Sequence, residues 1–404
     1  MGQSLGLAAY RAYVRRSQPE PYVATTQRPK GELLWIHAAE QGSLPTVLDL
    51  ARRLIAHRYG LHVLITCAAK TDMTCNGITV SAPPGEHPSD VDAFLDHWAP
   101  DAGLWLWGDL QPNLILKTAE KRIPLNLANA GQEGFDNRRE RWLPEVARDV
   151  LTHFERILVR SDAAMARLSK LGRNLDALEQ TAPLMPGGQA LPYVHSDFVD
   201  LGQVLAGRPL WFAASVQPTE VSVVLAAHRR ALRLSHRLLL VLNPGSEAQT
   251  EECLRQLSAE GLRTARWEDG DMPDDNCQVL LASAQDELGL WYRIAPLSFL
   301  GSSLSSGHGG LDPYEAAALG SAILYGPNVG RHLASYSRLA AAGAGRIVND
   351  ANALGAAVSQ LISPDHAASM AMAGWDVISQ GAAVSDRVME LIQAALDARE
   401  EGTA

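Results

Sequence analysis

The sequence predicts an α/β protein of two domains, each built on a parallel sheet with helices on both faces. Short apolar segments typical of buried strands alternate with helical segments along most of the chain, and this alternation favours parallel sheets. The chain has 404 residues, which is enough for two hydrophobic cores. A stretch with several proline, glycine and alanine residues, 186–207, is typical of a connection between domains.

The first domain is expected over residues 31–185, after a terminal helix and linker at residues 1–30. Its strands are predicted from short apolar runs, and its helices from apolar residues that recur every three or four positions. The predicted strands are residues 33–37, 61–66, 102–107, 123–127 and 154–159, and the predicted helices are residues 45–58, 94–98, 112–118 and 161–171.

The second domain is expected over residues 208–404 and repeats the same alternation. Its predicted strands are residues 208–215, 238–242, 297–300 and 323–325, and its predicted helices include residues 220–232, 287–295 and 385–399.

A loop rich in glycine and serine, residues 301–310, separates a predicted strand from a predicted helix. Asp312 is expected at the N-cap of this helix, Pro313 at its first position and Glu315 at its third. Free amides at a helix start attract anions, so this loop is a candidate anion site. The alternative is that Asp312 and Glu315 only form a capping box.

Residues 308–317 read His-Gly-Gly-Leu-Asp-Pro-Tyr-Glu-Ala-Ala. This segment resembles the nucleotide-sugar motif His-Gly-Gly-His-Asn-Pro-Leu-Glu-Pro/Ala-Ala of the bacterial 3-deoxy-D-manno-octulosonic acid (Kdo) transferases. The likeness continues through residues 318–327, where the family has Ala-Leu-Gly-Lys-Pro-Val-Leu-Phe-Gly-Pro. The resemblance implies a GT-B fold, with two Rossmann-like domains facing across a cleft. In such folds the last helix, here residues 385–399, often crosses back to the first domain. It also implies transfer of Kdo from CMP-Kdo to a lipid A type acceptor in lipopolysaccharide biosynthesis.

By this resemblance the second domain holds the nucleotide-sugar donor. The chain lacks three cations of the family pattern, because Ala128, Met185 and residues 243–245 stand where the family has Arg or Lys. Burial of an anion without compensating charge is costly, so a donor site of changed specificity or lowered affinity is expected. The donor-binding residues expected from the resemblance are Ser215, Gly307, His308, Gly309, Gly310, Asp312 and Glu315.

The turn after the first predicted strand resembles the family segment that carries the catalytic base. The family has Glu after the glycine of this turn, whereas this chain has Ser43 after Gly42 and a carboxylate at Glu40. A serine alone is no general base at neutral pH, but a desolvated carboxylate can be one. Glu40 is therefore the base candidate, with a solvated residue near a helix start as the alternative.

Two further residues complete the expected acceptor side. Asp109 follows a predicted strand at a family carboxylate position and is a second catalytic candidate, although it also suits an N-cap before Pro112. Asn126 matches a family asparagine and, with Gly42 and Ser43, is expected to bind the acceptor.

Composition limits the partners. The net charge is −10, which argues against nucleic-acid binding, and the four cysteines show no metal-ligand spacing. No metal and no cofactor are expected. Residues 1–16 combine apolar residues with three arginines, which fits either a peripheral membrane contact or a terminal helix packed on the domain. The resemblance places the protein at the cytoplasmic face of the bacterial inner membrane.

Three functions remain open from the sequence. The first is a Kdo transferase-like glycosyltransferase, inverting and metal-independent as that family is. The second is a degenerate paralogue that kept the fold as a binding or partner protein, and the third is a transferase with a different nucleotide-sugar donor.

Overall fold

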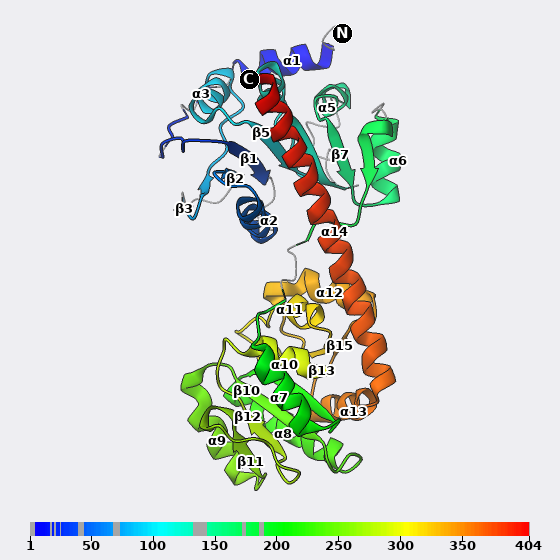
Figure 1. Ribbon diagram of the computed structural model, residues 1–404. Coiled ribbons are helices and arrows are strands. Elements are labelled where there is room, and N and C mark those ends of the chain that lie inside the picture. Colours follow the sequence, from blue (N-terminus) through cyan, green and yellow to red (C-terminus); the bar gives the residue numbers. More distant parts are fainter. Residues whose placement is uncertain are drawn as a thin grey trace. The chain divides into compact units, whose positions relative to one another are not determined.

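The computed structural model describes residues 5–16, 18–19, 22–24, 26–38, 44–67, 73–131, 144–171, 175–185 and 190–403. The chain forms two compact units (Figure 1), one of Met1–Gly187 with Gln380–Ala404 and one of Gly188–Ser379. Each unit contains one sheet with helices, so the prediction of two α/β domains is confirmed.

The first unit contains an eight-stranded sheet in the order β3-β4-β2-β1-β5-β6-β7-β8. Every pair is parallel except β3 with β4, which is antiparallel. The strands are β1 (Leu33–Ala38), β2 (His62–Cys67), β3 (Met73–Cys75), β4 (Ile78–Ser81), β5 (Ala102–Leu106), β6 (Leu125–Ala130), β7 (Arg156–Val159) and β8 (Leu178–Gln180).

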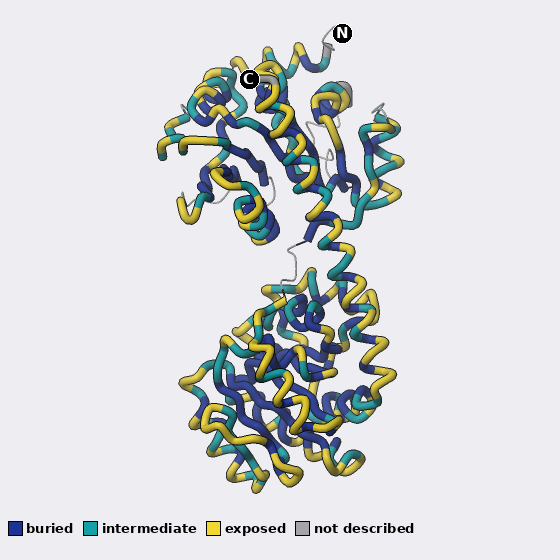
Figure 2. Tube along the Cα trace, in the orientation of Figure 1, coloured by how far each residue is buried: buried dark blue, intermediate teal, exposed yellow. Residues whose placement is uncertain are grey.

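Both faces of this sheet are buried, as the dark blue strands of Figure 2 show. In β1, Trp35 packs in a cluster with residues of α1, α3, α4 and α5, whereas Ile36 packs with α2 and the end of α14. Alternate side chains therefore support opposite helical layers. The helices are α1 (Leu5–Val14), α2 (Leu44–His57), α3 (Pro88–Trp98), α4 (Pro112–Glu120), α5 (Pro144–Leu151), α6 (Asp162–Lys170) and α14 (Pro364–Thr403).

The second unit contains a seven-stranded parallel sheet in the order β11-β12-β10-β9-β13-β14-β15. Its strands are β9 (Leu210–Val216), β10 (Leu239–Pro244), β11 (Thr264–Arg266), β12 (Val279–Leu281), β13 (Leu297–Leu300), β14 (Ala322–Tyr325) and β15 (Gly345–Ile347). Its helices are α7 (His195–Leu205), α8 (Pro218–Leu232), α9 (Thr250–Ala259), α10 (Leu288–Ile294), α11 (Pro313–Ala318), α12 (Leu333–Ala341) and α13 (Ala351–Leu361).

Two predicted boundaries differ from the structure. The expected connection at residues 186–207 contains helix α7, which packs against α10 and buries Leu201 and Leu205. The expected last helix at 385–399 is the end of α14, a single helix of 40 residues (red in Figure 1). Residues from Gln380 onward belong to the first unit, because Val388 and Ile392 are buried in its core.

The terminal helix α1 uses its apolar residues inside the first unit. Leu7 and Val14 are 3% and 6% exposed, and Tyr10 donates a hydrogen bond to Glu86. Tyr13, Arg15 and Arg16 remain exposed. Among the helices of the described residues, none has the length and apolar character that crossing a membrane requires.

Candidate functional site

The strand order of the second unit changes direction at β9. From β9 the chain first adds β10 on one side and later adds β13 on the other. In open parallel sheets, ligands bind beyond the carboxyl ends of the strands at such a reversal. The glycine-rich loop follows the carboxyl end of β13, so the topology brings residues 301–312 to this edge.

A buried carboxylate anchors the start of this loop. Glu220 lies in α8 and is 1% exposed. Its two oxygens accept hydrogen bonds from five backbone amides, which are the amide of Gln217 and four consecutive amides of the loop. The loop donors are Ser302 at 2.7 Å, Ser303 at 3.0 Å, Leu304 at 2.7 Å and Ser305 at 3.2 Å. The charge of Glu220 therefore fixes the backbone of the loop.

Ser302 connects the loop to β9 and closes the loop on itself. Its hydroxyl donates to the carbonyl of Ser215 at 2.8 Å and accepts from the side chain of Gln217 at 2.8 Å. Its carbonyl accepts from the amide of Gly310 at 3.0 Å. A Cβ on Gly301 would lie 2.5 Å from the carbonyl of Ala214, so only glycine allows this approach. The structure thus brings Ser215 and Gly310 together, as the sequence predicts.

The outer part of the loop is exposed and lies beside a cation. Gly307 and His308 are exposed, and Gly309 has a φ of 83°. The aliphatic part of Arg331 passes so close to Gly309 that a Cβ there would lie 2.7 Å from it. Among the described residues, Arg331 has no carboxylate partner, so its positive charge remains available to an anion at the loop.

Asp312 and Glu315 lie at the start of α11. The side chain of Asp312 accepts a hydrogen bond from the amide of Tyr314 at 3.0 Å, which confirms the predicted N-cap. Burial, with a smaller contribution from the negative charge of Asp312, raises the pKa of Glu315 to about 7. Glu315 can therefore donate as well as accept a hydrogen bond near neutral pH.

The first unit has its own reversal of strand order, at β1. The chain adds β2 on one side of β1 and β5 on the other, and Ala38 is in register with Leu106. Asp109 is exposed three residues beyond β5, so it lies near the end of β1. The base candidate Glu40 and the neighbouring Gly42 and Ser43 fall outside the described residues.

Asn126 does not share this edge. It is the second residue of β6, which ends at Ala130. Four residues of strand separate it from the carboxyl edge, a distance of about 13 Å. The structure therefore does not bring Asn126 together with Asp109, and its role in acceptor binding stays a prediction.

At the three positions where the cations of the family are missing, the side chains are buried or used within the fold. Ala128 is fully buried in the first unit, and Met185 is 6% exposed there. Asn243 uses its side chain internally, because it accepts from the amide of Ser215 at 3.0 Å and donates to the carbonyl of Ala282 at 2.9 Å. None of these positions offers a charge to a ligand.

Glu220 and Gln217, which hold the loop in place, are not among the site residues predicted from the sequence. Glu220 and Gln217 form a capping box at the start of α8. The local signal was Glu at the third position of a helix that begins at Pro218, directly after a strand that ends in small residues. That signal predicts the cap, but not the four loop amides that come from more than 80 residues away.

The fold of the chain has a counterpart among solved structures. Two Rossmann-like sheets, each with a reversal of strand order at its ligand edge, are the architecture of GT-B glycosyltransferases. The crystal structure of MurG from Acinetobacter baumannii has this fold, with a TM-score of 0.51 at 16% identity over 90% of this chain and 100% of that one.

Sequence comparisons point to one family within this class. The family model described as 3-deoxy-D-manno-octulosonic-acid transferase (kdotransferase) matches residues 12–184. The 3-deoxy-D-manno-octulosonic acid transferase of Bordetella pertussis is 27% identical over 380 residues, covering 89% of this chain and 87% of that protein. The Haemophilus influenzae enzyme of the same name is 25% identical over 391 residues, covering 93% and 89%. The chain is therefore similar to the Kdo transferases over most of its length, at low identity.

Proposed function

We propose that this protein transfers Kdo, or a related sugar, from a CMP-activated donor to a lipid A type acceptor in lipopolysaccharide biosynthesis. The observation that carries the proposal is the loop at residues 301–312. It lies at the ligand edge of the second sheet, and the buried charge of Glu220 fixes its backbone. A rigid loop with free outer amides is suited to an anionic sugar nucleotide.

In this proposal each part of the loop has a role toward the donor. The backbone of Gly307, His308 and Gly309 approaches the phosphate, and Arg331 supplies the positive charge that the family takes from other positions. Ser215 and Gly310 shape the inner wall through Ser302. Glu315, with its pKa near 7, hydrogen-bonds a hydroxyl or an anionic oxygen of the donor, and Asp312 orients the helix start.

The proposed reaction is an inverting displacement that needs no metal. The acceptor hydroxyl attacks the anomeric carbon of the sugar, the bond from that carbon to the CMP oxygen breaks, and CMP leaves with the electron pair. We assign Glu40 as the base that takes the hydroxyl proton and Asp109 as a second catalytic carboxylate. Gly42 and Ser43 are assigned to the acceptor.

The missing cations support a second candidate within the same fold. Because the side chain of Asn243 is used internally, the unit that holds the loop lacks one positive charge of the family pattern, and Ala128 and Met185 supply none in the first unit. That favours a different nucleotide-sugar, or a degenerate paralogue that binds without transferring. The exposed residues Tyr13, Arg15 and Arg16 support a peripheral contact with the cytoplasmic face of the inner membrane.

A thermal-shift screen with CMP, CDP, UMP, UDP and CMP-Kdo tests the donor. A ligand that binds the folded state raises the melting temperature by mass action, so we expect CMP and CMP-Kdo to give the largest shifts. A selective shift with UDP instead indicates a different donor. Transfer activity that disappears in Glu40→Ala supports the proposed base, whereas activity gained only in Ser43→Glu indicates a degenerate paralogue.

A further inference from the structure

A cavity of about 470 Å³ lies in the first unit, away from the carboxyl edge of the sheet. One wall is the start of β6 and β7, with Asn126 and Arg156, and the other is the end of α14. We call it the amino-edge cavity. Because the strands are parallel, this edge is opposite the one that carries Asp109. The cavity is lined by Arg122, Pro124, Asn126, Glu155, Arg156, Arg387, Leu391, Ala394, Ala395, Ala398 and Arg399.

Asn126 gives this cavity an unused polar group. The residue is 4% exposed, and its Oδ1 has no hydrogen-bond partner among the described residues. A buried amide oxygen without a partner is destabilising, and a ligand that donates a hydrogen bond to it would remove that cost. A side-chain amide can both donate and accept, so it suits a ligand oxygen and a ligand hydroxyl equally.

Two guanidinium groups in the lining keep their full charge. Arg156 donates to the backbone carbonyl of Asp176, and no carboxylate of the described residues pairs with it. Arg122 is exposed, and within the described part of the chain no acidic residue pairs with it. Both line the cavity together with Asn126. A guanidinium can bind an anionic oxygen pair through two parallel hydrogen bonds.

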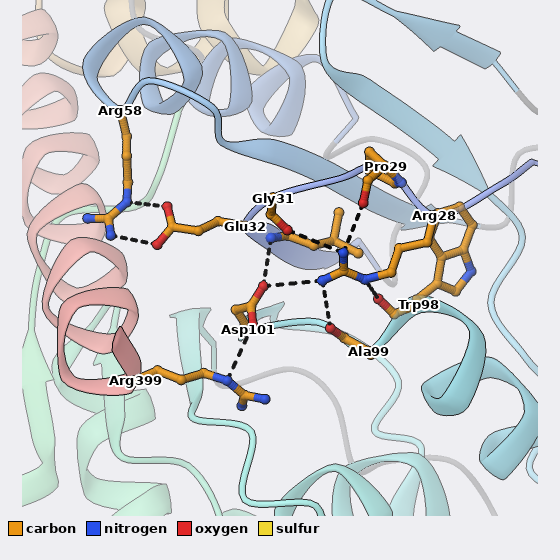
Figure 3. A network of polar contacts seen from close by, with 10 residues as sticks. Arg28, Pro29, Gly31, Glu32, Arg58, Trp98, Ala99, Asp101 and Arg399 are labelled. Atoms are coloured by element: carbon orange, nitrogen blue, oxygen red, sulfur yellow. Dashed lines mark hydrogen bonds and ion pairs between the residues drawn. The ribbon is translucent and has the colours of Figure 1, made fainter. Parts of the chain in front are cut away.

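Two further arginines are held in place on α14. Arg387 makes a bidentate ion pair with Glu179, at 2.8 and 2.9 Å. Arg399 pairs with Asp101 at 3.4 Å, and Figure 3 shows its guanidinium turned toward that carboxylate. The carboxyl group of Glu155 also lines the cavity, but the lining holds four arginines and only this one carboxylate. The lining as a whole therefore favours a negative ligand.

Small side chains of α14 leave room in the cavity for more than a bare ion. Ala394, Ala395 and Ala398 share one side of the helix with Leu391. A volume of about 470 Å³ falls within the range of about 300–1,000 Å³ that small-molecule sites occupy. The wall of alanines fits an apolar part that adjoins the anionic group.

We propose that the amino-edge cavity binds a phosphate group, with the guanidiniums of Arg122 and Arg156 on its oxygens and Asn126 on an adjoining polar group. The phosphate can belong to a small phosphorylated molecule or to a phospholipid headgroup. The site is separate from the sugar-nucleotide loop, which lies in the other unit, and it does not depend on the proposed transfer reaction.

Binding is measured on the full-length chain by calorimetry, with glycerol 3-phosphate and inorganic phosphate at constant ionic strength. A second arm measures sedimentation with vesicles of phosphatidylcholine that contain phosphatidic acid. The test variants are Arg122→Gln with Arg156→Gln, and separately Asn126→Leu. The control is Arg52→Gln, because Arg52 is exposed on α2 of the same unit and no carboxylate among the described residues pairs with it.

We expect the double variant to weaken binding by about tenfold or more per guanidinium lost, and the control to leave binding unchanged. If the double variant or Asn126→Leu does not fold, Arg122→Gln alone serves as the test, because Arg122 is exposed and its replacement should leave the fold intact. Binding of soluble phosphates identifies a small-molecule source, and binding of vesicles alone identifies a headgroup, provided that the variants abolish it. Equal binding by variants and control, or no binding in either arm, overturns the proposal.

Discussion

Replacement of the buried carboxylate under the sugar-nucleotide loop tests how that loop is held. In Glu220→Gln, one carboxylate oxygen becomes an NH2 group that faces backbone N–H donors. One oxygen accepts from Gln217 and Ser302 at 3.0 and 2.7 Å, and the other accepts from the next three loop amides. Two or three buried amides thus lose their acceptor. At about 1–3 kcal/mol each, the loop loses about 2–9 kcal/mol of stability.

The assay is hydrogen exchange of the peptide that contains residues 302–305, measured with CMP-Kdo affinity. A loss of about 2 kcal/mol accelerates exchange from a locally opened state by more than tenfold, and we expect donor affinity to fall with it. Glu247→Gln is the matched control, because Glu247 is exposed in the same unit. Unchanged exchange at residues 302–305 in Glu220→Gln would refute the role assigned to this carboxylate.

Three further predictions concern pH and packing. The pKa of Glu315 is about 7, above its ordinary value of 4.5, so the folded state holds more protons than the unfolded state between these values. The free energy of unfolding should therefore fall as pH rises from about 4.5 to 7 and level off above, and urea titrations of Glu315→Gln should show a smaller slope. In Gly326→Ala the new Cβ would lie 2.3 Å from a backbone oxygen, so thermal melts should show a loss of about 1–3 kcal/mol. The control Gly202→Ala has open space and should be neutral or stabilising. In urea titrations, Ile392→Ala should lower the free energy of unfolding by about 2–5 kcal/mol, because Ile392 is 1% exposed in the core of the first unit. The control Met372→Ala, on the same helix, should be near neutral because Met372 is 61% exposed.

Local signals predicted the elements that depend on neighbouring residues. Asp312 before Pro313 predicted the start of α11, and the structure confirms the cap. The resemblance to the family, rather than a local signal, predicted that Ser215 and Gly310 lie close together. They do so because the strands that precede them are adjacent and parallel.

Features that depend on distant packing were not predictable in the same way. Gly381 lies inside α14. A glycine weakens the helical pattern of the sequence at this point, but in the structure its lack of a side chain makes room for Met185. The five amides around Glu220 come from two segments that only the folded sheet brings together. Asn126 matched a family position, yet its place near the start of β6 puts it at the opposite edge from Asp109.

The most direct test of the account is transfer by the purified full-length chain, with CMP-Kdo and a lipid A precursor as substrates. Mass spectrometry should show one or more Kdo residues added to the lipid with equimolar release of CMP, and Glu220→Gln should lose this activity while Glu247→Gln keeps it. The account would be contradicted if the protein is folded but binds neither CMP nor CMP-Kdo, and if donor and acceptor remain intact after incubation with it.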